Sequence, residues 1–431
     1  MPIAKYSNLA TYNSATKSTT ESNVSFIQDG TGIKIDGINV IVSNPSVGDI
    51  LFLDANGNIR WIKCDTFQSS SFPSGCKTVG VCFKRQGSKC WVVNKNNTGK
   101  KWSNIFEWIV TGYNLDGASH TVTFTMDGST FNNAFTYSAT TVSDFISQLN
   151  TYFSTAANFA DDHLKNGSFV ARLIDGSIHL YCLNFYTWQQ EYLGTSGLTL
   201  APNVGKEIDE ISWMVRNNKA QSWGGANFKR FKEYISANGR TPTSNEGLKT
   251  TDWPVTLDAF TNSSYCSLLR TTYGDYDTYI KSCMAIYPYT RGVMTLSDGK
   301  SQTSKLANVT YLDASGNANY KYSAARYCYG ISYNHTSLES GKWWLPSLPE
   351  LGLLMSDITY GLSGIDTTNC DRVNRSLSKI GNTVPVTSNL WSSSRSGLTY
   401  SWSYGGGGNF HNSIFYEGLI AVPFTLLKIN N

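Results

Sequence analysis

Charged residues are scarce in this sequence. They make up 15% of its 431 residues, against about 25% in typical globular domains, and the net charge is only +4. A charge so small and so evenly spread does not favour nucleic-acid binding. Aromatic residues are instead frequent, at 13%. The composition predicts a polar, nearly uncharged surface whose Tyr and Trp side chains can contact sugars or protein partners.

Membrane-spanning and export segments are also missing. No apolar run approaches the roughly 20 residues that a transmembrane helix needs. The first residues, Met1–Thr20, contain no apolar core of a signal peptide. We therefore expect no membrane insertion, and assembly in the cytoplasm in which the chain is made.

Cysteine patterns give no sign of a metal or redox site. The nine cysteines form no C-x-x-C pair, and assembly in the cytoplasm predicts reduced, mostly buried thiols. The run Asp161-Asp162-His163 has no second ligand group, so we expect a solvated loop there. No Ser/His/Asp grouping or carboxylate pair stands out, and we expect no catalytic residue, metal or cofactor. The cysteines are Cys64, Cys76, Cys82, Cys90, Cys182, Cys266, Cys283, Cys328 and Cys370.

Turn signals divide the chain into four parts, 1–46, 47–103, 104–205 and 206–431. The first part contains the hairpin signals Asp29-Gly30 and Asp36-Gly37 behind a polar tip. Such a segment suits attachment to a partner or oligomerisation. An ordinary frayed terminus would have the same composition, so both interpretations stay open.

The second and third parts contain strand and helix patterns. Short apolar strands flank Asn56-Gly57, which is a strong hairpin signal. In the third part, the apolar residues of 142–153 recur at helical spacing, with Thr141 or Ser143 as the N-cap. A further hairpin is predicted at Asp175-Gly176. The third part therefore reads as a small α+β module.

The fourth part has less regular signals. A helix over Phe228–Ile235 is predicted to stop at Asn238-Gly239, and a second helix covers Ser323–Tyr333. Residues 240–320 are too irregular to assign. The chain ends in short strands that include Leu419–Leu427.

The most informative run begins at Gly341 and reads Gly-Lys-Trp-Trp-Leu-Pro-Ser-Leu-Pro-Glu-Leu-Gly-Leu-Leu-Met. Ser347 and Glu350 have the spacing of a capping box, and Pro349 falls in the first helical turn, where its missing N–H costs nothing. An extended segment therefore leads into a capped helix. We expect the motif tryptophans Trp343, Trp344 and Trp391 to fill the core.

The order of motifs resembles one family. It runs from Ser323–Cys328 through the Trp-Leu-Pro-Ser loop to Leu390–Ser394, then Trp402 and Ala421–Phe424. This order is similar to the DUF1566-like branch of the C-type-lectin fold, which is related to variable proteins of diversity-generating retroelements and to sulfatase-modifying enzymes. The sequence departs from the family at Leu390, where Tyr is common, and at Ala421, where Arg is common.

The resemblance implies a β-rich α+β fold. Residues 47–103 and 206–431 would form a C-type-lectin-like domain, interrupted by a small α+β insert at 104–205. The run Asn23–Gly37 also resembles the start of fibre proteins of crAss-like tailed phages. Together these resemblances imply a non-enzymatic virion fibre assembled in the host cytoplasm. We expect a homotrimer held to capsid or tail proteins by the extended segment 1–46, with a head fibre slightly favoured over a tail fibre.

In that family the binding face follows the Trp391 strand. Aromatic and polar side chains crowd there around Gly405–Gly408, which cannot form a regular core element, and they suit a host-surface glycan or protein. Burial of the same rings is the alternative interpretation. The candidate binding residues are Arg395, Tyr400, Trp402, Tyr404, His411, Phe415 and Tyr416.

Two other functions stay open. A bacterial surface adhesin, or one diversified by a retroelement, would carry the same binding domain but needs an export route. An oxidase of the formylglycine-generating type needs a cysteine pair that binds copper or exchanges disulfides. Neither Cys328 nor Cys370 lies in the late strand where that thiol is expected.

Overall fold

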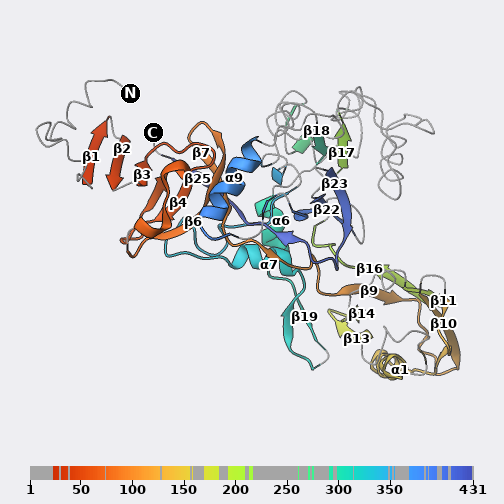
Figure 1. The fold of residues 1–431 in the computed structure, drawn as a ribbon. Helices are drawn as coiled ribbons and strands as arrows, with labels where there is room; N and C mark the ends of the chain where they lie inside the picture. The colour runs from red at the N-terminus through yellow and green to blue at the C-terminus, as the bar shows by residue number, and fades with distance from the viewer. Residues whose placement is uncertain are drawn as a thin grey trace, which may run out of the picture.

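The computed structural model describes residues 23–28, 31–36, 39–72, 74–126, 129–155, 158, 169–183, 193–208, 213–216, 261, 270–271, 274–275, 291–294, 299–313, 315–347, 350–351, 354, 368–382, 385–386, 388–395, 400–405 and 409–429. Within these ranges, strands in several sheets far outnumber the four α-helices (Figure 1). The predicted β-rich α+β class is confirmed. None of the helices in these ranges is long and apolar enough to cross a bilayer.

The largest sheet has eight strands in the order β1-β2-β3-β5-β4-β6-β7-β25, and every neighbouring pair is antiparallel. Strand β25 lies at one edge, so a late segment of the chain returns to pair with an early one. The strands are β1 (Asn23–Gln28), β2 (Thr31–Asp36), β3 (Asn39–Val42), β4 (Ile50–Leu53), β5 (Ile59–Ile62), β6 (Lys77–Gln86), β7 (Lys89–Asn94) and β25 (Phe424–Lys428). Two 3-10 helices, η2 (Cys64–Thr66) and η3 (Ser69–Ser71), follow β5.

Side chains cover both faces of this sheet at β4. Every residue of β4 is buried, as a strand with two covered faces requires. Ile50 and Phe52 belong to a core shared with helix α9 (Thr368–Lys379), while Leu51 and Leu53 belong to a second core around Trp343. Helix α9 had not been predicted from the sequence.

Two hairpins have the same turn. The carboxylate of Asp54 accepts hydrogen bonds from the backbone N–H groups two and four residues later, at 3.0 and 2.9 Å, and Gly57 has a φ of +80°. Asp313 accepts the same two bonds, both at 2.9 Å, in the hairpin of β19 (Thr310–Leu312) and β20 (Ala318–Tyr320). Side-chain bonding of this kind fixes a tight turn. The hairpin predicted at Asn56-Gly57 is confirmed.

A second sheet has five strands in the order β23-β22-β21-β24-β8. Its central strand β21 is buried at all six residues. The short strands predicted to include Leu419–Leu427 are present as β24 in this sheet and β25 in the eight-stranded sheet. The break between these two strands includes Pro423, which has no N–H to donate to a ladder. The strands are β8 (Thr98–Gly99), β21 (Leu390–Arg395), β22 (Tyr400–Gly405), β23 (Asn409–Ile414) and β24 (Ile420–Ala421).

The third part of the chain forms two more sheets, one with the order β13-β14-β9-β16 and one in which β10 pairs with β11, β12 and β15. The predicted helix is confirmed as α1 (Val142–Ser154), with the hydroxyl of Thr141 accepting from the N–H of Asp144 at 3.1 Å. The hairpin at Asp175-Gly176 is also confirmed. The strands are β9 (Phe106–Thr111), β10 (His120–Met126), β11 (Ser129–Thr130), β12 (Phe135–Tyr137), β13 (Phe169–Ile174), β14 (Ser177–Cys182), β15 (Leu193–Ser196) and β16 (Thr199–Pro202).

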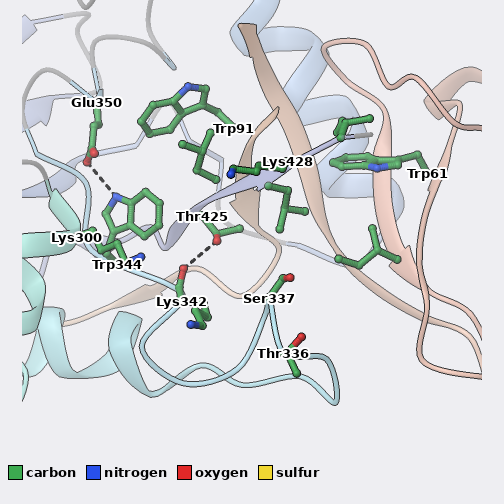
Figure 2. Close-up of a pocket in the computed structure, with 14 residues that line it drawn as sticks. Trp61, Trp91, Lys300, Thr336, Ser337, Lys342, Trp344, Glu350, Thr425 and Lys428 are labelled. Carbon is green, nitrogen blue, oxygen red and sulfur yellow. Dashed lines mark hydrogen bonds between the residues drawn. The ribbon is translucent and has the colours of Figure 1, made fainter. Parts of the chain in front are cut away.

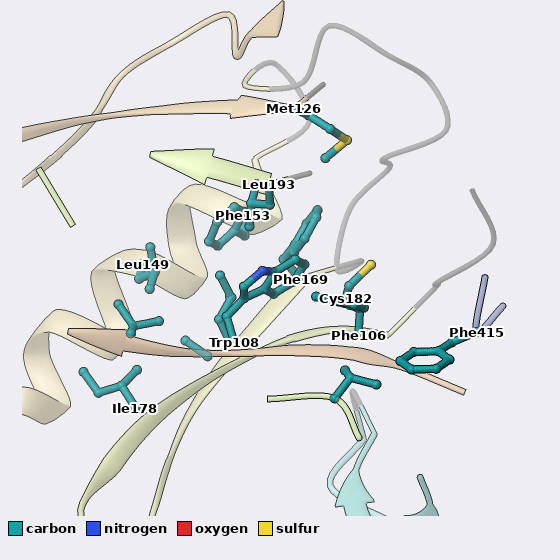
Figure 3. Close-up of a cluster of buried hydrophobic side chains, with 14 of the residues drawn as sticks. Phe106, Trp108, Met126, Leu149, Phe153, Phe169, Ile178, Cys182, Leu193 and Phe415 are labelled. Carbon is teal, nitrogen blue, oxygen red and sulfur yellow. The ribbon is translucent and has the colours of Figure 1, made fainter. Parts of the chain in front are cut away.

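The core of this third part does not end at its boundary. Between α1 and the strands, rings such as Phe153 and Phe169 pack together (Figure 3). The same cluster continues to Trp102 and Phe415, whose rings stack with centroids 4.2 Å apart, and on to Trp391. The insert therefore shares its hydrophobic core with the fourth part of the chain.

The remaining elements are two helices and a short hairpin. Helix α6 (Gly299–Leu306) had not been predicted, whereas α7 (Ser323–Gly330) confirms the predicted helix but ends three residues early. Strands β17 (Trp213–Arg216) and β18 (Arg291–Met294) pair with each other. The helix predicted over Phe228–Ile235 lies outside the described residues.

Candidate functional site

A groove follows strand β25. The extended segment that contains Trp344 lies along this strand, where the N–H of Trp344 donates to the carbonyl of Phe424 at 3.0 Å and the N–H of Phe424 donates back at 2.9 Å. The hydroxyl of Thr425 donates to the carbonyl of Lys342 at 2.8 Å. These bonds fix the loop against the strand and leave a hollow beside them.

The hollow has a volume of about 490 Å³, which falls in the roughly 300–1,000 Å³ range of ligand sites. Figure 2 shows Trp344 and Trp91 toward one end and Trp61 at the other, with Lys428 between them. The lining comes from β5, β7, β25, α6 and two loops. It consists of Ile59, Trp61, Trp91, Lys300, Thr336, Ser337, Lys342, Trp344, Glu350, Thr425, Leu426, Leu427, Lys428 and Ile429.

The three indole rings form the walls of the groove. Trp61 and Trp344 expose only 4% and 5% of their surface, so Trp91, which is half-buried, is the most accessible. The rings of Trp91 and Trp344 meet edge to face, with centroids 6.3 Å apart. Hydrogen bonding fixes Trp344, because its Nε1–H donates to a carboxylate oxygen of Glu350 at 3.0 Å. The walls are therefore held in place before any ligand arrives.

Glu350 also fulfils half of the predicted capping box. The backbone N–H of Ser347 donates to the same carboxylate oxygen at 2.8 Å, as the box requires. The prediction that the motif tryptophans fill the core is confirmed, since Trp343 and Trp391 expose none of their surface and Trp344 only 5%. Trp344 is therefore a core residue that also lines the groove.

The structure buries most of the binding face predicted from the sequence. Arg395, Trp402, Tyr404 and Phe415 expose 5%, 4%, 2% and 0% of their surface. Trp402 and Tyr404 lie in the core beneath the eight-stranded sheet, and Phe415 stacks on Trp102. The guanidinium of Arg395 donates to the carbonyl of Gly205 at 2.8 Å. The prediction of an exposed face is wrong for these four side chains, because β21 is buried along its length, the aromatic side of β22 is covered, and Phe415 packs into the core on Trp102.

The other three predicted residues lie at the margins of the same sheet. Tyr400 and Tyr416 are half-buried, and Tyr416 packs against the core of the insert. His411 lies on β23, in register with Ser403 of β22. Ligand binding by this set stays a prediction, and Tyr400 and Tyr416 each keep a partly exposed side chain.

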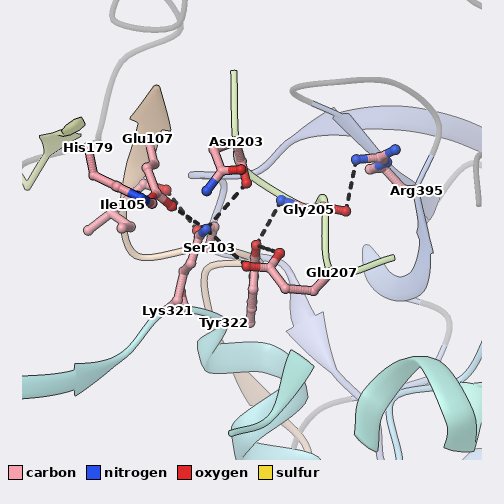
Figure 4. Close-up of polar contacts among 10 residues, drawn as sticks. All are labelled: Ser103, Ile105, Glu107, His179, Asn203, Gly205, Glu207, Lys321, Tyr322 and Arg395. Atoms are coloured by element: carbon pink, nitrogen blue, oxygen red, sulfur yellow. Dashed lines mark hydrogen bonds and ion pairs between the residues drawn. The ribbon is translucent and has the colours of Figure 1, made fainter. Parts of the chain in front are cut away.

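A polar cluster joins the insert to the fourth part of the chain (Figure 4). The ammonium of Lys321, 2% exposed, pairs with the carboxylates of Glu107 on β9 and Glu207, and Glu107 also bonds His179 of β14. Burial alone raises the pKa of Glu107, but the hydrogen bond from His179 and the charge of Lys321 more than offset it. The pKa of Glu107 therefore lies below its ordinary value.

Tyr322 extends this cluster. Burial, together with the neighbouring charge of Glu207, raises the pKa of the Tyr322 hydroxyl well above its ordinary value. The hydroxyl therefore stays protonated, donates to Glu207 and accepts from the N–H of Gly205 at 2.7 Å. The cluster joins the insert to the fourth part of the chain and lies outside the groove, so we assign it a structural role.

Two cysteines lie side by side in the eight-stranded sheet. The Sγ atoms of Cys82 on β6 and Cys90 on β7 are 3.0 Å apart, and neither residue exposes any surface. The hydrogen bond from Cys90, and then burial, raises the pKa of Cys82. Such thiols are poor nucleophiles. Within the described ranges, no three or more His, Cys, Asp or Glu side chains are grouped to hold a metal ion.

Comparison with known proteins gives no relative. No family model, curated protein or solved structure matches the chain. Function must therefore be argued from the groove and the sequence.

Proposed function

We propose that this protein is a non-enzymatic attachment protein whose lectin-like domain binds carbohydrate in the tryptophan groove. The observation that carries the proposal is the convergence of Trp61, Trp91 and Trp344 on one hollow. Sugar rings have faces rich in C–H groups, which pack on aromatic rings, while their hydroxyl groups need polar neighbours. At the rim, Thr336 and Ser337 are exposed and supply hydroxyl groups.

The rigidity of the groove supports the proposal. Trp344 is held by Glu350 and by its bridge to Phe424, so binding would order few side chains. A preformed site loses little conformational entropy on binding, and this favours recognition of weakly binding, flexible sugars. Trp91 is the ring on which we expect a sugar to pack.

A glycan array followed by calorimetry tests carbohydrate binding. Trp91→Ala is expected to lower affinity about tenfold, which corresponds to about 1.4 kcal/mol. The matched control is Tyr320→Ala, which removes an aromatic ring that is 41% exposed on β20, outside the groove. Trp91→Phe keeps a ring in place if the alanine variant is unstable. Equal affinity of wild type and a folded Trp91→Ala variant would refute binding at this groove.

The same proposal includes a place in a virion. The chain is a homotrimeric phage fibre subunit, with the head slightly favoured over the tail, and residues 1–46 attach it to capsid or tail proteins. Support comes from the low charge, the ordered lectin-like motifs and the fibre-like run Asn23–Gly37. Immunogold labelling of purified virions tests this part. Label on head fibres is the expected result, and particles without label would refute the virion assignment while leaving carbohydrate binding standing.

A further inference from the structure

Positive charge predominates along the groove. Three lysines, Lys300, Lys342 and Lys428, line it, while Glu350 is the one acidic side chain among the residues of the lining. Lys300 and Lys428 are exposed, and the side chain of Lys342 exposes 43% of its surface. Their ammonium groups can therefore reach a ligand in the groove.

The acidic partners of these lysines do not balance them. The Glu350 residue is only 6% exposed, and one of its carboxylate oxygens accepts two N–H groups, from Trp344 at 3.0 Å and from Ser347 at 2.8 Å. Its charge is thus engaged in holding the wall. Glu339 lies 3.9 Å from Lys342, and both side chains are about half exposed. An ion pair with such a long separation and such exposed side chains is weak, so it leaves Lys342 able to pair with a ligand.

At the far end of β25, two like charges face each other. Lys428 stands directly opposite Lys89 of β7 in the antiparallel register, and both residues are exposed. Like charges in this position repel each other, so a bound anion would relieve an existing strain. At the other end, the ammonium of Lys300 lies 6.0 Å from the centre of the Trp344 ring. One cation, Lys300, therefore stands beside the aromatic wall at one end of the groove, and a second, Lys428, lies on β25 between the two ends.

We propose that the groove takes an acidic saccharide. The sugar ring packs against the indoles, above all Trp91, and its carboxylate, sulfate or phosphate group pairs with Lys300 or Lys428. This inference rests on the proposed carbohydrate binding and specifies the class of ligand. In this proposal the lysines provide the preference for an acidic over a neutral saccharide, and the indole rings provide the affinity that both share. Experiments can therefore measure the two contributions separately.

The test compares matched acidic and neutral ligands by calorimetry. The probes are an oligogalacturonate and its carboxyl-reduced form, a sulfated galactan oligosaccharide and its desulfated form, and a phosphorylated oligosaccharide and its dephosphorylated form. At low salt we expect at least one acidic form to bind about tenfold more tightly than its neutral partner. That advantage should shrink as the Debye length falls from about 30 Å near 0.01 M salt to about 3 Å near 1 M. The acidic group with the largest advantage identifies the chemistry of the ligand.

Single variants assign the selectivity to the groove. Lys300→Gln and Lys428→Gln are expected to weaken binding of the acidic form about two- to fivefold each, the effect of one exposed charge pair, and to weaken binding of the neutral form less. Lys305→Gln, an exposed position on the same helix as Lys300 but outside the lining, is the control. Trp91→Ala should weaken both forms.

The outcomes separate this inference from the proposed function. Equal binding of every acidic and neutral pair, with Trp91→Ala weakening both members, would overturn acidic selectivity and leave carbohydrate binding intact. Acidic preference that survives Lys300→Gln and Lys428→Gln would also overturn it, because the charge would then lie elsewhere. No binding of any saccharide would overturn both proposals.

Discussion

Replacing Lys321 with methionine should destabilise the junction between the insert and the rest of the chain. The ammonium of Lys321 is 2% exposed and neutralises Glu107, 4% exposed, and Glu207, 24% exposed. Methionine has a similar length but no charge, so the variant keeps the packing and leaves a buried carboxylate without its cation. Breaking a buried pair in this way costs about 3–5 kcal/mol of unfolding free energy. The hydrogen bond that Glu107 keeps with His179 places the expected value near the lower end of that range.

The effect should depend on pH with a defined sign. In the wild type, the pKa of Glu107 is lowered from its ordinary value of 4.5. A depressed carboxyl pKa stabilises the fold above the unfolded value and ceases to do so as the pH falls through the folded value. In Lys321→Met the lysine no longer lowers the pKa of Glu107, so that pKa lies above its wild-type value although His179 still lowers it. The difference in unfolding free energy between wild type and variant should therefore narrow as the pH falls from the pKa of Glu107 in the variant to its lower pKa in the wild type, because a protonated Glu107 needs no cation.

Urea denaturation, followed by tryptophan fluorescence at neutral and acidic pH, measures both effects. Lys305→Met is the control, because Lys305 is exposed on α6. The double variant Glu107→Gln with Lys321→Met should recover part of the loss, since the most buried carboxylate of the cluster is then removed together with its cation. Equal midpoints for the Lys321 and Lys305 variants at neutral pH, or a gap that does not change with pH, would refute the assigned role of the cluster.

Three further outcomes are expected. Trp402→Ala should lower the unfolding free energy by about 3–5 kcal/mol because its ring is buried; a wild-type melting temperature would contradict that burial. Cys82 and Cys90, fully buried, should react with a thiol reagent only after denaturation, and fast labelling of the native protein would show that the sheet opens there. Gly299→Ala should cost about 1–3 kcal/mol, since a Cβ would lie 2.2 Å from a neighbouring carboxylate oxygen, whereas Gly330→Ala, with open space around it, should cost less; equal melting temperatures would exclude the predicted clash.

Local elements could be predicted because their signals are local. The cap at Thr141, the turn at Asn56-Gly57 and the apolar spacing of α1 each lie within a few residues, and the structure confirms all three. Helix α9 was not predicted, although the sequence contains a signal for it. Its buried residues Cys370, Val373 and Leu377 recur at helical spacing within a polar segment.

The predicted binding face failed for a physical reason. Tyr400, Trp402 and Tyr404 alternate along β22, so the sequence correctly puts them on one side of a strand. Alternation does not tell which side faces water. The serines between them, Ser401 and Ser403, are also fully buried, since small hydroxyl groups pack tightly and bond to neighbouring strands. Both sides of β22 are therefore covered.

No short stretch of the sequence predicts the groove. Trp61, Trp91 and Trp344 come from three separate segments and meet only because β25 pairs with β7 on one side and with the Trp344 segment on the other. Each ring alone has the sequence context of a core residue. Only the pairing of distant strands shows that they share a wall.

The position of β25 also affects the order in which the protein can fold. Its partner β7 is synthesised long before β25, and the edge that β7 offers stays open until β25 has been made. Pairings between such distant segments form slowly, because a long loop must close first. During that interval the apolar side chains of β7, such as Val93, lack their final cover. Translation arrest before β25 should thus yield a chain that recruits chaperones or aggregates, while the hairpins of the insert, which close over short loops, can already have formed.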